Sequence, residues 1–238
     1  MGAPGSVRGA PRVSCEAEHV DEKQRCKLAA VEWAARGRGA PLGTAAAHAL
    51  AAGTDSSTVV LVEGISDQLA LEALAERRGR NLDAECVSIV PIGGATTIGR
   101  FLDLFGPQGL DVRMAGLCDA GEEAAFQRGL ERAGLGSNLT RAEMEPLGFY
   151  VCVADLEDEL IRSLGSACVE RVIDAQGELG SFRTFQKQPA QQGRTNEQQL
   201  RRFMGTRGGR KIQYARLLVD ALDLTKVPRP LDRVLAHV

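Results

Sequence analysis

The sequence predicts an α/β protein with a mostly parallel four-stranded sheet flanked by helices, followed by a helical C-terminal extension. Apolar, β-branched runs of strand length alternate with helical patterns, and only helical patterns follow after about residue 166. The predicted strands are the segments 58–62, 86–92, 112–118 and 149–154. The first of them has the apolar composition of a strand buried on both faces, which is typical of parallel sheets.

The first strand runs into an acidic turn that opens a helix. Glu63 follows the strand, and Gly64 lets the backbone turn without a Cβ clash. Ser66 suits a helix cap and Asp67 suits a first turn, and helix-forming residues continue over 68–79. Ligands of open α/β sheets bind outside the carboxyl ends of strands, so this turn is a candidate site.

Acidic residues follow three of the four predicted strands. Besides Glu63, Asp119 and Glu122 follow the third strand, and Asp155 and Glu157 follow the fourth. Carboxyl ends of parallel strands meet at one edge, where clustered carboxylates are costly unless cations neutralise them. Acids also favour helix N-termini on their own account, which is the alternative explanation.

The second strand is followed by Gly93 and Gly94 at the start of a helix. Such a turn leaves backbone N–H groups for a phosphate, although paired glycines also simply make turns. The chain contains neither G-x-x-x-x-G-K-[ST] nor G-x-G-x-x-G, so ATP and dinucleotide binding are not supported.

Composition narrows the function classes. The chain has 238 residues, 44% hydrophobic and 25% charged, as in ordinary soluble globular proteins. No apolar run approaches the ~20 residues of a membrane span, and no secretory signal is visible. The six cysteines form no C-x-x-C pair and the three histidines show no ligand spacing, which argues against zinc. We expect reduced thiols, a cytoplasmic protein and no membrane partner.

Charge is unevenly distributed along the chain. Residues 183–216 hold nine Lys or Arg and one acid, whereas residues 119–160 hold ten acids and three Arg. A cation site beside a polyanion would produce this pattern, and so would two helical surfaces that pair with each other. The candidate phosphate contacts are Arg194, Arg201, Arg202, Arg207 and Arg210.

The organisation expected from these patterns has four parts. They are a disordered arm over 1–20, a helical N-terminal extension over 21–57, the α/β domain over 58–165 and a basic helical region over 166–238.

The motifs resemble the Toprim domain, and within it the nuclease half of the overcoming-lysogenisation-defect (OLD) family. That half has an E-G-x-S-D turn, a Gly-Gly segment, a G-L-x-D segment and a C-terminal Lys in a helical region. The matching residues here are Glu63, Gly64, Ser66, Asp67, Gly93, Gly94, Gly116, Leu117, Asp119 and Lys211. Two departures stand out: Gly121 replaces the second acid of the family's Asp-x-Asp, and the ATPase half is missing.

The resemblance implies a Toprim-like (Rossmann-like) fold and a metal-dependent nuclease acting on DNA in preference to RNA. Mg²⁺ or Mn²⁺ is the expected cofactor, and a separate ATPase partner and a homo-oligomer are left open. The expected metal ligands are Glu63, Asp67, Asp119, Glu122, Asp155 and Glu157. The expected catalytic residues are Glu63, Asp119 and Lys211. The alternatives are a non-catalytic nucleic-acid-binding or recombination-mediator module and another Toprim nucleotidyl transferase or hydrolase.

Overall fold

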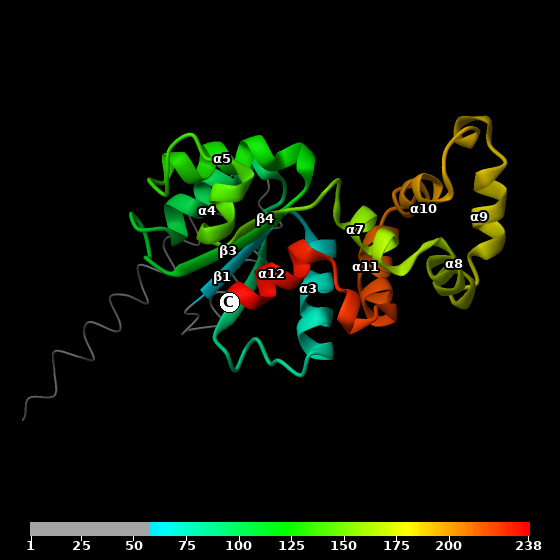
Figure 1. The fold of residues 1–238 in the computed structure, drawn as a ribbon, viewed down its shortest axis with the longest axis horizontal. Coiled ribbons are helices and arrows are strands. Elements are labelled where there is room, and N and C mark those ends of the chain that lie inside the picture. Colours follow the sequence, from blue (N-terminus) through cyan, green and yellow to red (C-terminus); the bar gives the residue numbers. More distant parts are fainter. Residues whose placement is uncertain (1–57) are drawn as a thin grey trace, which may run out of the picture.

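A computed structural model describes residues 58–238 of the chain. The disordered arm expected over 1–20 and the helical extension expected over 21–57 lie outside the described residues. The division of the remainder into an α/β domain and a basic helical region stays a prediction, although the two parts are easily recognised in Figure 1.

Four parallel strands form the sheet, which confirms the predicted fold class. They are β1 (Thr58–Val62), β2 (Val87–Pro91), β3 (Arg113–Cys118) and β4 (Phe149–Val151), in the order β2-β1-β3-β4. Val60 of β1 lies between Ile89 of β2 and Ala115 of β3. The central position of β1 explains its apolar composition, because both of its edges and both of its faces are covered.

Three predicted strands are shorter in the structure: β3 lacks its first predicted residue, and β2 and β4 are shortened for local reasons. Cys86 has φ +54°, in the left-handed region, so β2 begins one residue later than expected. The backbone N–H of Val153 donates to the Glu159 carboxylate at 2.7 Å instead of to a neighbouring strand, so β4 ends at Val151.

Helices cover both faces of the sheet (Figure 1). Their bounds are α3 (Ile65–Arg77), α4 (Ile98–Phe105), α5 (Glu123–Arg132), α6 (Arg141–Met144), α7 (Leu156–Leu164), α8 (Ser166–Ala175), α9 (Leu179–Gln186), α10 (Asn196–Met204), α11 (Arg210–Ala221) and α12 (Arg229–His237). One face carries α4 and α5, and their packing buries Phe105, Phe126 and Phe149. The other face carries α3 and α12, so the final helix returns to the sheet.

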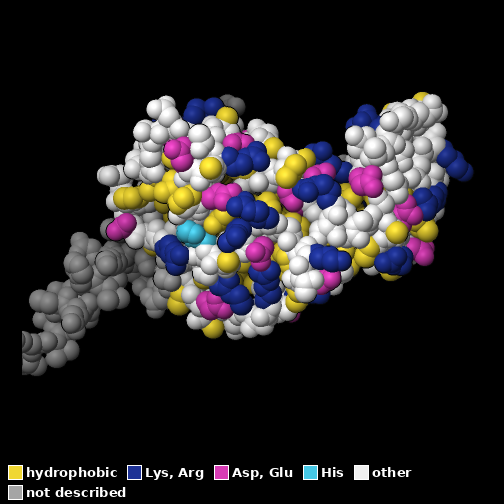
Figure 2. Space-filling view, in the orientation of Figure 1, with side chains coloured by type: hydrophobic (Ala, Val, Ile, Leu, Met, Phe, Trp, Pro, Cys, Tyr) yellow, Lys and Arg dark blue, Asp and Glu magenta, His cyan; other side chains and the backbone are white. Residues whose placement is uncertain are grey.

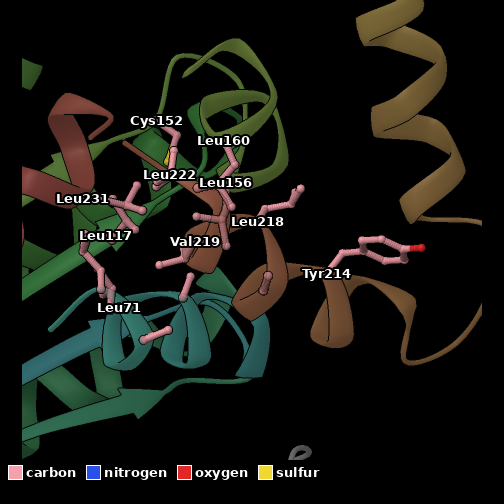
Figure 3. Packing of buried hydrophobic residues seen from close by; sticks show 14 of the residues in the cluster. Leu71, Leu117, Cys152, Leu156, Leu160, Tyr214, Leu218, Val219, Leu222 and Leu231 are labelled. Carbon is pink, nitrogen blue, oxygen red and sulfur yellow. The ribbon is translucent and has the colours of Figure 1, made fainter. Parts of the chain in front are cut away.

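The second core extends from the sheet into the helical region. Figure 3 shows Leu71 of α3 and Leu117 of β3 at one end and Tyr214 of α11 at the other, all within one buried cluster. The helix α11 packs along α3 and also contacts α7. This continuous apolar packing fixes the start of α11 relative to the strand ends.

The helices α8, α9 and α10, which we call the outer helices, stand away from the sheet (Figure 1). Phe203 joins them, because its ring lies 5.1 Å from that of Phe182 and 5.6 Å from that of Phe185. The guanidinium of Arg210 stacks over Phe203 at 4.0 Å and bonds to the Glu178 carboxylate at 2.8 Å. The outer helices therefore pack on an aromatic part of the second core, beside the ion pair between buried Arg210 and Glu178.

Figure 2 shows Lys and Arg side chains grouped over α3 and α12, outside the segment 183–216. They include arginines with partners nearby: Arg78 pairs with Asp232 at 2.6 Å and Arg229 pairs with Glu145 at 2.6 Å. This group therefore holds α12 in place. None of the described helices is long and apolar enough to span a bilayer.

Candidate functional site

Two neighbouring strands bring Glu63 and Asp119 together. Glu63 follows β1 and Asp119 follows β3, and these strands pair directly. A Glu63 carboxylate oxygen accepts a hydrogen bond from the Asp119 backbone N–H at 2.9 Å. This bond orients Glu63 across the edge of the sheet. The side chain of Asp119 itself makes no hydrogen bond within the described residues.

Asp67 is held at the first turn of α3. One of its oxygens accepts from the Gly64 backbone N–H at 2.9 Å, and only 8% of the residue is exposed. The turn between β1 and α3 is thus closed by the side chain that the E-G-x-S-D motif supplies.

The fourth strand leads to Asp155 and Glu157 at the start of α7. Asp155 caps the helix by accepting from the Asp158 N–H at 2.8 Å, and its other oxygen pairs with Arg201 of α10 at 2.6 Å. Glu157 pairs with Lys211 of α11 at 2.9 Å. Both acidic residues are less than a tenth exposed, so two buried carboxylates each meet one cation from the helical region.

The carboxylates of this edge share one electrostatic environment. Burial raises the pKa of Asp119 to about 8, together with the charges of its acidic neighbours, Glu63 first among them. Burial also raises the pKa of Asp67 to about 7, with the charges of Glu63 and Glu157 contributing. Burial raises the pKa of Glu63 as well, and the charge of Glu122 adds to it. The edge therefore holds more negative charge than its own residues neutralise.

Lys211 is one of the two cations that meet the carboxylates of this edge. Burial is the largest single influence and disfavours its charge, but the hydrogen bond and charge of Glu157, with the charges of Asp155 and Asp119, raise the pKa of Lys211 above its ordinary value. The ammonium therefore stays charged beside the carboxylates.

The donor set fits a hard divalent cation. Carboxylate oxygens are the ligands that Mg²⁺ and Mn²⁺ prefer, and a cation would relieve the repulsion that raises the pKa values of Asp67 and Asp119. As the side chains stand, no three His, Cys, Asp or Glu residues between 58 and 238 are close enough together to ligate one ion. Metal binding would therefore require side-chain adjustment at this edge.

There is room for a side chain at Gly121, where the sequence departs from the Asp-x-Asp pattern. A Cβ at Gly121 would meet no atom within 4 Å, so packing does not require glycine there. Glu122 is half-buried near Glu63, as its effect on the pKa of Glu63 indicates. Glu123 pairs with Arg141 at 2.5 Å, which makes Glu122 the better replacement for the second acid.

Gly93 and Gly94 are placed differently from the expectation of free N–H groups. Their backbone N–H groups donate to the Glu63 carbonyl oxygen at 3.0 and 3.3 Å. They therefore join the loops after β1 and β2, and these donors are already engaged within the chain.

The arginines expected at a phosphate surface fall into two groups. Arg201 pairs with Asp155, and Arg210 is 5% exposed in its pair with Glu178. Arg194, Arg202 and Arg207 are exposed, although Arg207 lies 3.3 Å from Glu178. Only two ion pairs, Arg201–Asp155 and Lys211–Glu157, join the basic segment 183–216 to the acidic segment 119–160. Both ion pairs lie at the start of α7, next to the strand ends.

Sequence reasoning missed two structural acids. Glu159, 4% exposed, holds the loop after β4 through Val153 and pairs with Arg162 at 2.7 Å. Glu178 accepts from Arg210 and from the Tyr214 hydroxyl. Glu159 lies in a run of acidic residues, and nothing in the sequence distinguishes its structural role from that of its neighbours. No sequence signal indicates a structural role for Glu178.

Comparisons with known proteins agree with this architecture. Residues 56–120 match the family model for the overcoming lysogenization defect protein-like TOPRIM domain. The C-terminal region of the Xanthomonas campestris pv. campestris OLD protein superposes with a TM-score of 0.62 at 23% identity, covering 77% of this chain and 92% of that one. The C-terminal region of the Burkholderia pseudomallei OLD protein superposes with a TM-score of 0.60 at 20% identity, covering 76% of this chain and 96% of that one. A search of curated proteins found no match.

Proposed function

Since residues 56–120 form an OLD-like TOPRIM domain, we propose that the chain hydrolyses phosphodiester bonds of DNA with the help of Mg²⁺ or Mn²⁺. The observation that carries the proposal is that Glu63 after β1, Asp119 after β3 and Glu157 at the start of α7 lie at one edge of the sheet, where Glu157 pairs with the ammonium of Lys211. The family supports a nucleic acid as the substrate.

Each residue of the edge would have a distinct role. Glu63, Asp67, Asp119 and Glu157 would hold the metal, with Glu122 in place of the missing second acid. Asp155 is secondary, because its two oxygens already bind the Asp158 N–H and Arg201. The metal, when bound, supplies charge stabilisation for the attacking and leaving oxygens. Lys211 would stabilise negative charge that develops on the phosphate.

The exposed cations would hold the nucleic acid by its backbone. Arg194, Arg202 and Arg207 are the expected phosphate contacts, since Arg210 is buried and Arg201 is paired. Any ATP-driven step would use an ATPase outside residues 58–238, such as a separate partner, because these residues contain no phosphate-binding loop of the Walker type.

The test is a cleavage assay with Mg²⁺, Mn²⁺ or chelator on linear, circular and single-stranded DNA and on RNA. The parent should cut only with metal, and Glu63→Gln and Asp119→Asn should each abolish cutting. Asp103→Asn is the matched control, because Asp103 is exposed on α4. A Glu63→Gln, Asp119→Asn double variant that cuts as fast as the parent would show that the site is misplaced.

Gly121 favours a second candidate, a non-catalytic nucleic-acid-binding module, because one expected ligand is absent. Such a module would keep its affinity for DNA in chelator and would cut no member of the panel. Restoring the acid by Gly121→Asp separates the two candidates, since space for the side chain exists. A gain in metal affinity measured by calorimetry would support the metal-dependent site.

A further inference from the structure

A cleft of about 400 Å³ opens beside the acidic edge, between the starts of α3 and α11. It is lined by Ile65 and Ser66 of α3, by Gly205 and residues 207–209 of the connecting loop, and by Lys211 and Ile212 of α11. The volume lies within the range of about 300–1,000 Å³ that small-molecule sites occupy.

The cleft and the acidic edge share residues. Ile65 and Ser66 lie in the chain between Glu63 and Asp67, and Lys211 bonds to Glu157 at 2.9 Å. A group bound in the cleft is thus next to whatever the carboxylates hold. For a nucleic acid, a nucleotide held in the cleft would lie beside the phosphate that meets the carboxylates.

One part of the cleft is apolar and open to solvent. Ile65 and Ile212 are each 38% exposed, and they are two of only four large hydrophobic residues exposed within residues 58–238. Exposed apolar side chains that gather in a concave site are typical of ligand-binding surfaces. The flat face of a nucleobase would cover them.

The other part of the cleft suits an anion. Arg207 has 71% of its side chain exposed, and Lys211 adds a second cation. The backbone N–H groups of Gly208 and Gly209 donate to no acceptor in the described chain. These two N–H groups lie just before α11, a helix of 12 residues, at its positive N-terminal end.

An apolar wall beside cations and free N–H groups matches a nucleotide better than it matches duplex backbone. A duplex presents phosphates and sugars outward while its base faces stay stacked, so it would leave Ile65 and Ile212 uncovered. An unpaired nucleotide offers a base face and a phosphate together, and enzymes bind such bases between apolar side chains.

We propose that this cleft binds one unpaired nucleotide next to the scissile phosphate, with its base against Ile65 and Ile212 and its phosphate against Arg207 and the Gly208–Gly209 backbone. The inference rests on the proposed nuclease function and names its substrate class: nucleic acid that is single-stranded, frayed or gapped at the cut. Complete duplex would be a poorer substrate.

The test measures the binding of fluorescein-labelled 20-nucleotide DNA by anisotropy, single-stranded and duplex, with Ca²⁺ in place of Mg²⁺. We expect Ile212→Ser and Ile65→Ser to weaken single-strand binding roughly tenfold, the value of one lost base contact, and to leave duplex binding unchanged. Leu224→Ser is the matched control, because Leu224 is also 38% exposed but does not line the cleft. An abasic position at the bound nucleotide should reproduce the loss.

Arg207→Ala supplies a second test that does not disturb apolar packing. It should weaken single-strand binding and lower the salt slope by about one charge. Equal losses for single strand and duplex in both isoleucine variants, or no loss in either, would overturn the inference. Thermal unfolding of each variant confirms that it is folded.

Cleavage of the same DNA in Mg²⁺ separates this inference from the proposed function. If the parent cuts and the isoleucine variants match it in binding and cutting, the nuclease proposal stands and the cleft assignment fails. If the parent cuts nothing but single-strand binding still depends on Ile65 and Ile212, the nuclease proposal fails and the nucleotide cleft stands.

Discussion

Asp67→Asn should make the metal-free protein more stable while removing much of its response to Mg²⁺. Asp67 is 8% exposed, and its pKa is raised from 3.8 to about 7, first by burial and then by the charges of Glu63 and Glu157. The asparagine carbonyl can still accept from the Gly64 N–H, so the turn should survive. The substitution thus removes charge and keeps shape.

The magnitude follows from the difference between the folded and unfolded pKa values. At about pH 8, a carboxyl with these values costs the fold up to about 4 kcal/mol. The buried amide keeps a desolvation cost of its own, so we expect a gain of about 1–2 kcal/mol. For a chain of this size that is a rise in Tm of about 2–8 °C.

The raised pKa of Asp67 also determines the direction in which stability changes with pH. An acid whose pKa is raised on folding binds its proton more tightly in the folded state, so the parent should lose stability as pH rises from about 4 through about 7. Asp67→Asn should show a flatter profile over that interval. With saturating Mg²⁺ the parent should regain stability above pH 7, because the metal replaces the proton.

Thermal unfolding followed by circular dichroism, at several pH values with Mg²⁺ or chelator, checks these expectations. Asp103→Asn should follow the parent throughout, since Asp103 is exposed on α4. If Asp67→Asn lowered Tm in chelator near pH 8, this would refute the interpretation that the carboxylates at the strand ends carry more negative charge than their neighbours neutralise.

Three further variants test the site and its supports. Lys211→Ala should lower kcat by about 10²–10³ with KM nearly unchanged, whereas a parent-like kcat would leave Lys211 as a binding cation only. Gly116→Ala should lower the free energy of unfolding by about 1–3 kcal/mol, because its Cβ would lie 2.6 Å from the Phe149 ring; chemical denaturation measures it. Tyr214→Phe should cost about 1–2 kcal/mol in the same assay through its lost bond to Glu178, with kcat retained, and an unchanged stability would mean that this bond contributes nothing.

The sheet could be predicted because its signals are local. The apolar composition of residues 58–62 and the acids after three strands depend only on the strand period and on the meeting of parallel carboxyl ends. The helices of residues 166–221 also follow local periodicity, as predicted from the helical patterns after about residue 166.

Side-chain pairing could not be predicted, because it depends on long-range packing. Which cation meets which acid is decided by the contacts of α10 and α11 with α7. Thus Arg201 reaches Asp155, 46 residues away, and Lys211 reaches Glu157, 54 residues away. The engagement of Gly93 and Gly94 by the Glu63 carbonyl likewise requires β1 and β2 to be side by side.

The return of α12 to the sheet has a consequence for how the protein could diversify. Because α7 and α11 contact each other and α12 packs on β3 and β4, the outer helices are topologically an insertion whose two ends leave from one place. Insertions of this kind can be lengthened, shortened or exchanged without changing the strand order that places the acids. Swapping residues 166–204 for other helices that keep a cation opposite Asp155 should therefore alter which substrates reach the edge while leaving the carboxylates in position.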